Sequence, residues 1–433
     1  MAVWQCKVWE YDLVNKWEVN MENRVVITGM GVVSPIGNTI ESYWDSLKEG
    51  KCGIKVLPEE LQLEGTKVNV AGMVTDFSPE PYIEKREAKR IARFSQFAIY
   101  ASKKALEMAN IDMEKEDADK VGVIIGSGIG ALDSIEQETI KLHEKGARRV
   151  SPLFVPMSIA NMAAGNVSIY TGAKGICSTV VTACASGTQS IGEAFRSLKA
   201  GINDVIIAGG TEACITPLGI AGFNALTALS TTEDPMRASI PFDKERNGFV
   251  LGEGAGILVM ETLEHAQKRG AKILAEIVGY GTTGDAYHIT KPMPGGEGAA
   301  KAMQLALDEA KIKPEEVDYI NAHGTSTYYN DLYETMAIQK VFGEETKVAI
   351  SSTKSMTGHL LGGAGGIEAV AVAKVVEEDF VPPTIGYEHP DEECPLDYVP
   401  NTGRNQKVRY ALSNSFGFGG HNATIIMKKW EDA

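Results

Sequence analysis

The sequence predicts an α/β fold built from two related halves. Apolar strand-like segments alternate with helical patterns along the chain, as they do in α/β proteins. The 433 residues exceed the roughly 250 to 300 at which a single hydrophobic core stops growing. A shift of 175 positions also places Cys184 on His359 and Glu193 on Glu368. We therefore expect a duplicated architecture with equivalent helix starts in the two halves.

In the first half, residues 84–98 have a helical pattern that places basic side chains along one face. Residues 121–125 are strand-like and end in a glycine-rich turn. Residues 178–183 form a β-branched run that ends in small residues around Cys184 and then opens a helix. Backbone N–H groups at a helix start favour negative charge, so we expect the Cys184 thiol to ionise more readily than a free thiol. From this residue alone, a buried structural cysteine is the commoner interpretation.

In the second half, residues 273–278 are strand-like and end at another glycine-rich segment. Residues 319–322 form a short apolar strand that delivers His323, followed by hydroxyl side chains. His359 lies in a later glycine-rich segment, and a last glycine loop at residues 414–422 precedes the final strand. A cysteine at a helix start and two histidines at strand ends would supply a nucleophile and bases if the fold brings them together.

Four ordered motifs carry a resemblance to a known family. They are Thr182-Ala-Cys-Ala-Ser-Gly187, Asn321-Ala-His-Gly-Thr-Ser-Thr327, Thr353-Lys-Ser-Met-Thr-Gly-His-Leu-Leu-Gly362 and Asn414-Ser-Phe-Gly-Phe-Gly-Gly-His-Asn422. Together they resemble the signatures of the β-ketoacyl-[acyl-carrier-protein] synthases, most closely the type II synthases of bacterial fatty-acid synthesis. The resemblance runs from about Arg24 to Lys428. It implies the thiolase-like fold, in which duplicated halves pack as five layers (α-β-α-β-α).

On this resemblance we divide the chain into three parts. Residues 1–20 are an appendage of unknown purpose, residues 21–270 form the half with the nucleophile Cys184, and residues 271–433 form the half with His323 and His359.

The resemblance implies a decarboxylative Claisen condensation that lengthens an acyl chain by two carbons in fatty-acid biosynthesis. Cys184 takes the acyl group as a thioester, while His323 and His359 serve the decarboxylation of malonyl-carrier protein. The backbone N–H groups of Cys184 and Phe418 form the oxyanion hole. Two imidazole N–H donors would stabilise the enolate that forms when CO2 leaves.

Two further residues match family positions that support the histidines, Lys354 and Glu368. No charged residue lies between positions 355 and 367, which favours a buried Lys354 beside Glu368 over an exposed lysine at a strand end.

The family match also implies residues that bind the substrate. Thr325 and Thr327 match hydroxyls that bind the phosphopantetheine arm, although threonines after a strand are also common in turns. Ile129 matches the end of the acyl pocket, and Phe223 and Phe418 match residues that shape it. The sequence departs from the family after Thr327: Tyr328 and Leu332 stand where a proline and a lysine are common. This departure puts the affinity for pantetheine in doubt.

The resemblance implies no metal and no permanently bound cofactor, because the substrates are carried on the phosphopantetheine of acyl carrier protein. The net charge of −15 opposes binding to nucleic acid or an anionic membrane. Local basic residues match the positions where the family docks its carrier: Arg86, Lys89, Arg90, Arg148 and Arg149. A solvated charged face is the simpler interpretation of such a cluster.

Several observations bear on assembly and location. Between residues 150 and 192 the only charged residue is Lys174, which predicts a surface withheld from water, as core or as a subunit interface. The family forms homodimers across this region. Prolines and asparagines interrupt the segment, so no membrane span is expected. The cysteines show neither metal spacing nor a disulfide framework, and the chain is expected to be cytoplasmic.

Four other functions are open alternatives. A nicotinamide enzyme is suggested by the glycine patterns at residues 126–131 and 279–284, although two prolines follow the second where a helix should start. A degradative thiolase would use a second cysteine as base, and a chain-length partner subunit usually lacks the nucleophile. A polyketide ketosynthase would share every catalytic motif.

Overall fold

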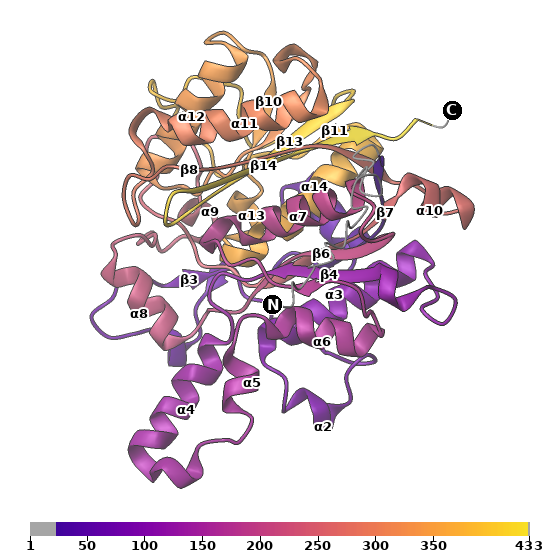
Figure 1. The fold of residues 1–433 in the computed structure, drawn as a ribbon. Coiled ribbons are helices and arrows are strands. Elements are labelled where there is room, and N and C mark those ends of the chain that lie inside the picture. The colour runs from indigo at the N-terminus through magenta and orange to yellow at the C-terminus, as the bar shows by residue number, and fades with distance from the viewer. Residues whose placement is uncertain (1–22, 432–433) are drawn as a thin grey trace, which may run out of the picture.

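A computed structural model describes residues 23–431, so the appendage at residues 1–20 lies outside the described residues. Ten strands form one sheet in the order β10-β9-β13-β14-β8-β1-β7-β6-β4-β5 (Figure 1). Their bounds are β1 Val25–Val33, β4 Val121–Gly126, β5 Cys177–Ser178, β6 Val205–Glu212, β7 Gly254–Thr262, β8 Ala275–Gly284, β9 Tyr319–Asn321, β10 Ala349–Ser351, β13 Tyr410–Gly417 and β14 His421–Lys429.

The sheet consists of two halves with the same strand order. The first half runs β1-β7-β6-β4-β5 and the second runs β8-β14-β13-β9-β10. They join where β1 pairs antiparallel with β8, from Val25 opposite Ile277 to Ile27 opposite Ala275. The duplication predicted from the sequence is therefore confirmed by the topology.

Helices fill three layers around the two halves of the sheet. Between them lie α7 (Ser186–Lys199) and α14 (Ala364–Glu378), which contact strands of both halves (Figure 1). The outer face of the first half is covered by α3 (Arg93–Ala109) with α6 (Met162–Thr171), and that of the second half by α11 (Glu297–Ala310) with α12 (Tyr328–Phe342) beside it. The layers follow the predicted α-β-α-β-α sequence.

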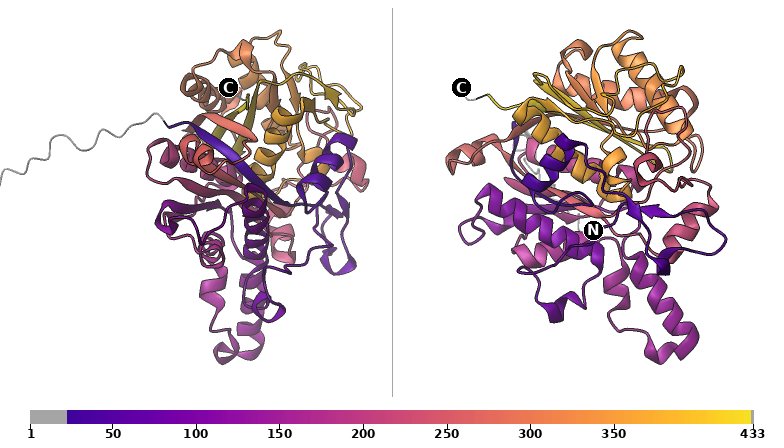
Figure 2. Two further views of the ribbon diagram at one scale, coloured as in Figure 1. Left: turned by 90° about the vertical axis from the view of Figure 1, so that its right-hand side faces the viewer. Right: turned by 180° about the vertical axis from the view of Figure 1, so that it is seen from behind.

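The remaining elements lie mostly around this body. Figure 2 shows α4 and α5 projecting away from it. The helices are α1 Ile40–Glu49, α2 Lys85–Ala88, α4 Leu132–Lys145, α5 Phe154–Ser158, α8 Pro217–Ala225, α9 Pro235–Ala238, α10 Leu263–Lys268 and α13 Lys354–Thr357. The 3-10 turns are η1 Glu59–Leu61, η2 Ala118–Lys120, η3 Ala147–Arg149, η4 Ala183–Ala185, η5 Pro294–Gly296, η6 Pro314–Glu316 and η7 Leu361–Gly363. Two small hairpins pair β2 (Lys55–Val56) with β3 (Val70–Ala71), and β11 (Phe380–Val381) with β12 (Arg404–Asn405).

Two expectations about local structure were wrong. The helix expected at residues 84–98 is broken, because α2 ends at Ala88 and α3 begins at Arg93 after extended backbone at Ala92. Arg93 turns inward to pair with Glu253 at 2.8 Å, so it does not share an outer face with the other basic residues. The shift of 175 positions is also wrong, because the starts of α7 and α14 and of η4 and η7 are each 178 positions apart.

The structure leaves the boundary between residues 270 and 271 as a prediction, although this position lies in the turn between α10 and β8. Within residues 23–431, no helix is both long enough and apolar enough to cross a membrane.

Candidate active site

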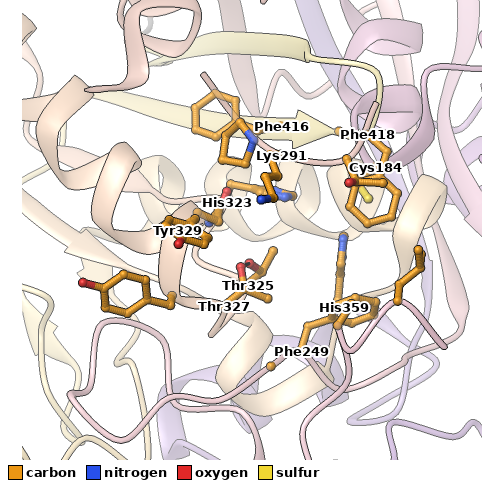
Figure 3. Close-up of a pocket in the computed structure, with 18 of the residues that line it drawn as sticks. Cys184, Phe249, Lys291, His323, Thr325, Thr327, Tyr329, His359, Phe416 and Phe418 are labelled. Atoms are coloured by element: carbon orange, nitrogen blue, oxygen red, sulfur yellow. Dashed lines mark hydrogen bonds between the residues drawn. The ribbon is translucent and has the colours of Figure 1, made fainter. Parts of the chain in front are cut away.

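Residues from all four sequence motifs meet around one cavity of about 400 Å³ (Figure 3). The cavity wall includes Cys184, His323, Thr325, Thr327, His359, Phe416 and Phe418, together with Phe223, Phe249 and Leu361. The segments that carry these residues are far apart in the chain. The sequence-based expectation that the cysteine and the two histidines converge is therefore met.

Cys184 is the middle residue of the 3-10 turn η4, directly before α7. The turn begins at Ala183, whose φ of 51° is unusual for a residue other than glycine. Gly417 packs against this turn so closely that a Cβ atom there would lie 2.7 Å from the carbonyl oxygen of Thr182 and 3.1 Å from the backbone nitrogen of Cys184. This approach brings the Phe418 backbone to the sulfur of Cys184 (Figure 3).

The expected easy ionisation of Cys184 was wrong. Burial, together with the nearby carboxyl of Glu212, raises the pKa of its thiol to about 12. Three features oppose this rise: the positive charge of Lys354 and hydrogen bonds from the backbone N–H groups of Phe418 and Cys184. The side chain is only 9% exposed, so loss of hydration outweighs the helix start. At neutral pH the sulfur of free Cys184 is therefore a neutral thiol.

His323 and His359 lie side by side in the cavity wall. Their ring centroids are 5.3 Å apart and their planes are nearly perpendicular, at 85°. His359 also contacts the ring of Phe249 and points toward Cys184 in Figure 3, while His323 contacts the ring of Phe416. Burial lowers the pKa of both imidazoles well below the ordinary value, and the charge of Lys354 lowers it further. Both rings are therefore neutral at neutral pH.

Lys354 and Glu368 form a buried ion pair behind the histidines, as predicted. Each side chain is 1% exposed. Neither residue lines the cavity, so the pair acts on the site through its charge and packing. A buried lysine stays charged only with such a partner, and here its charge helps to keep both imidazoles unprotonated.

Two buried acids that the sequence analysis missed hold the loop after β9. Glu334 accepts hydrogen bonds from the backbone N–H groups of His323 and Gly324, both at 2.8 Å, and burial raises its pKa to about 7. Asp331 accepts the backbone N–H of Thr325 at 3.0 Å. Both acids lie on α12, where acidic side chains in a helical pattern predict a solvated face. No signal in one sequence distinguishes them from exposed acids.

Glu212 is a third missed acid and supports the nucleophile side of the site. It is fully buried and accepts hydrogen bonds from the Ser127 hydroxyl at 2.9 Å and from the backbone N–H groups of Gly128 at 2.6 Å and Gly362 at 3.1 Å. One carboxylate thus ties a loop of the first half to η7 of the second.

Comparison with known proteins identifies the family. Residues 22–266 match the family model described as "Beta-ketoacyl synthase, N-terminal domain", and residues 274–388 match "Beta-ketoacyl synthase, C-terminal domain". The chain belongs to the β-ketoacyl synthase family.

Relatives of this β-ketoacyl synthase chain match nearly its whole length. A Staphylococcus aureus (strain COL) protein named 3-oxoacyl-[acyl-carrier-protein] synthase 2 is 53% identical over 95% of this chain and 100% of its own length. A Synechocystis protein of the same name is 52% identical over 95% of this chain and all of its own.

Solved structures agree in fold. A type II polyketide ketosynthase in complex with its acyl-carrier protein superimposes with a TM-score of 0.88 at 36% identity, covering 95% of this chain and 100% of the other. A β-ketoacyl synthase from Burkholderia phymatum also gives 0.88, at 35% identity over 94% of this chain and all of its own. The thiolase-like fold expected from the resemblance is confirmed.

Other predicted site residues of this synthase lie in different places. Thr325 and Thr327 share a hydrogen bond of 2.8 Å at the cavity wall, and Phe223 packs edge-on against Phe249 beside it. Ile129 does not line the cavity, and its side chain is 36% exposed. Its expected place at the end of the acyl pocket stays a prediction.

The five predicted docking residues are all exposed, on two separate elements. Arg86 lies on α2, with Lys89 and Arg90 directly after it, and Arg148 and Arg149 lie in η3. Their role in docking also stays a prediction.

The structure argues against two of the alternatives. The second glycine pattern lies inside strand β8, and the next helix starts only at Glu297, so no helix N-terminus follows it. Among residues 23–431, Cys184 is the only cysteine in the cavity wall, so this part of the chain places no second cysteine there to act as a thiolase base. Among residues 23–431, no cluster of three or more histidines, cysteines or acids is placed to hold a metal ion.

Proposed function

We propose that this chain condenses an acyl group carried on acyl carrier protein with malonyl-acyl carrier protein, giving 3-oxoacyl-acyl carrier protein in fatty-acid biosynthesis. The observation that carries the proposal is the single cavity shared by Cys184, His323 and His359. A sulfur nucleophile beside two neutral imidazoles has the groups for both acyl transfer and decarboxylation.

In the first step, the sulfur of Cys184 attacks the incoming thioester and the pantetheine thiol leaves with a proton. Because the free thiol is neutral, its proton has to depart as the carbon–sulfur bond forms. The backbone N–H groups of Cys184 and Phe418 favour negative charge on the sulfur. The same N–H groups would stabilise the oxyanion that forms at the thioester carbonyl. The apolar residues around Cys184, among them Leu229, Phe249 and Leu361, would receive the acyl chain.

In the second step, the malonyl thioester loses CO2 to give an enolate, which attacks the acyl carbonyl on Cys184 and breaks its carbon–sulfur bond. The Cys184 sulfur leaves as a thiolate and takes up a proton from solvent, so the free thiol is restored. As CO2 leaves, negative charge develops on the oxygen of the malonyl thioester, where His323 and His359 donate hydrogen bonds. The Nδ1 atoms of both rings are buried and have no partner among residues 23–431. A buried lone pair without a donor costs less than a buried N–H without an acceptor, which favours the tautomer with its proton on Nε2.

The carrier protein belongs to this proposal as substrate and partner, with Thr325 and Thr327 binding its phosphopantetheine arm and the five basic residues docking its surface. The names of the relatives support this, since each includes acyl-carrier-protein, and so does the ketosynthase solved with its carrier. The 53% identity to synthases of this name, against 36% to the polyketide ketosynthase, favours fatty-acid synthesis over the polyketide alternative.

A cytoplasmic homodimer completes the proposal. Apolar side chains gather on the stretch between residues 150 and 192, where Lys174 is the single charge, and several are exposed in the single chain: Val155 by 61%, Ile169 by 72% and Val181 by 55%. The same stretch contains β5, at the edge of the sheet, where an unpaired strand is open to a second copy.

Intact-mass analysis after incubation with acyl-acyl carrier protein tests the proposal. We expect an acyl adduct on the native chain and on Cys214→Ala, a control that removes a buried cysteine outside the cavity wall. Cys184→Ala should form no adduct and no 3-oxoacyl product when malonyl-acyl carrier protein is added. An adduct of equal yield on Cys184→Ala would refute the assignment.

A further inference from the structure

One cation in the cavity wall has no role in the chemistry above. Within the part of the chain that the structure describes, Lys291 is the only lysine or arginine that lines the cavity, and it belongs to the loop between β8 and η5. Its ammonium forms no ion pair or hydrogen bond with any residue in the described range 23–431. In the view of Figure 3, the side chain extends over the cavity from this loop.

The backbone around Lys291 is held in place. The ring Nδ1 of His288 accepts hydrogen bonds from the backbone N–H groups of Thr290 and Lys291, each at 3.1 Å. The loop is also tied to the glycine loop after β13, because Gly419 donates to the carbonyl of Ile289 at 2.8 Å. The loop that carries Lys291 is therefore fixed by hydrogen bonds, while the Lys291 ammonium itself has no partner among the described residues.

Most of the other acidic and phenolic groups on this side of the cavity already have hydrogen-bond partners. The carboxylate of Asp285 accepts hydrogen bonds from Asn422 at 2.7 Å and from the backbone of Met293 at 3.0 Å. The Tyr328 hydroxyl donates to Glu393 at 2.8 Å. Tyr329 packs on Tyr328 with 5.3 Å between ring centroids, and its own hydroxyl has no partner within residues 23–431. A cation and a phenol therefore stand free at one cavity.

We propose that Lys291, assisted by the Tyr329 hydroxyl, binds the phosphate of the phosphopantetheine arm and makes this chain select phosphorylated thioesters. The proposal rests on the proposed function, which brings such an arm to Cys184. Lys291 is exposed, whereas His323 and His359 are 2% and 3% exposed, so the cation stands at the mouth and the histidines at depth. The phosphate lies at the far end of the arm from the thioester, which matches the mouth.

The other anion of the reaction is the malonyl carboxylate, and it fits this cation less well. A lysine beside that carboxylate would stabilise the substrate more than the transition state, in which the charge moves to the thioester oxygen. Such an arrangement would slow the loss of CO2. The two neutral histidines avoid this cost, which leaves the phosphate as the better partner for Lys291.

The test measures acyl transfer to Cys184 from two small thioesters of one saturated acyl chain, acyl-phosphopantetheine and acyl-pantetheine. The native chain should prefer the phosphorylated thioester, and the ratio of the two rate constants should fall about tenfold in Lys291→Gln, as expected for a hydrogen bond to a charged group. Lys291→Arg should keep most of the preference, Tyr329→Phe should lose a smaller part, and added salt should weaken it in the native chain. Lys268→Gln, an exposed lysine on α10, is the matched control.

An unchanged ratio in Lys291→Gln would overturn the proposal. So would slower decarboxylation of malonyl-pantetheine in this variant together with an unchanged ratio, because Lys291 would then bind the carboxylate. If no variant and no thioester gives an adduct on Cys184, the proposed function fails and this proposal fails with it. If acyl adducts form on Cys184 but the ratio of the two rate constants is the same in Lys291→Gln as in the native chain, only the proposal about Lys291 is refuted.

Discussion

The two halves of the molecule share one strand order but place different chemistry at their shared centre. In the first half, η4 leads into α7 and carries Cys184 as its middle residue; in the second, η7 leads into α14 and carries Gly362 at that position. Both turns begin at a residue with a left-handed backbone, Ala183 with a φ of 51° and Leu361 with a φ of 49°. The same local geometry supplies a nucleophile once and a packing contact once.

The second half builds its functional groups elsewhere. His323 follows β9 and His359 follows α13, before η7, so neither occupies the position equivalent to Cys184. The duplicated scaffold fixes where the two turns meet, while the reactive groups are set by residues particular to each half. Variants of residues in one half test whether that half supplies one reaction step and not the other.

The largest expected effect comes from the histidines of the second half. His323→Ala or His359→Ala should each slow decarboxylation of malonyl-acyl carrier protein by roughly 10²- to 10³-fold, the usual cost of losing one oxyanion donor. Acyl transfer to Cys184 should persist, because the first half supplies the nucleophile. Release of CO2 and formation of the acyl adduct are measured separately, with the exposed His143 on α4 changed to alanine as control. Equal losses in both steps would contradict the division between the halves.

A smaller effect is expected at the turn of the second half, on stability. A Cβ at Gly362 would lie 2.2 Å from the backbone nitrogen of Gly128 and 2.8 Å from the Glu212 carboxylate. Gly362→Ala should therefore lower the free energy of unfolding by about 1–3 kcal/mol, as overpacking usually does. Gly222→Ala, in the exposed α8 where a Cβ meets nothing within 4 Å, should be neutral or raise it by up to about 1 kcal/mol. Thermal unfolding of both variants provides the measurement. If Gly222→Ala is destabilised and Gly362→Ala is not, the close packing at Gly362 does not contribute to stability as predicted.

Much of this arrangement could be predicted from the sequence, because the motifs are local. The turn around Cys184 and the segments with His323 and His359 could be anticipated from residue type and spacing. The pair of Lys354 with Glu368 came from the family resemblance, supported by the lack of charge between positions 355 and 367. The family resemblance gave the five-layered fold. The local structure of each segment is determined largely by the residues within that short stretch of chain.

What could not be predicted depends on tertiary burial. Burial reversed the expected direction of the Cys184 pKa, since a helix start predicts a lower pKa and only the packed structure shows how little water reaches the sulfur. The carboxyls of Glu212 and Glu334 accept backbone N–H groups from distant loops, and no local pattern separates them from solvated acids. The break after α2 has no glycine or proline between Lys89 and Ala92, and the inward pairing of Arg93 with Glu253 depends on a partner 160 positions away.

The smallest expected effect is a change in pH dependence caused by the buried pair behind the histidines. Burial is the main reason that the pKa of each imidazole is low, and the charge of Lys354 adds to it. Removing that charge in Lys354→Met should raise both pKa values, so more of the site is protonated at a given pH. Because an imidazolium would stabilise the malonyl carboxylate that has to leave as CO2, the acid limb of the decarboxylation rate should move to higher pH. The control Lys354→Met with Glu368→Leu removes both charges, and it should move the limb less, since no uncompensated carboxylate is left near the rings. If the acid limb stays in place in Lys354→Met, burial alone keeps the histidines neutral and the pair serves only packing.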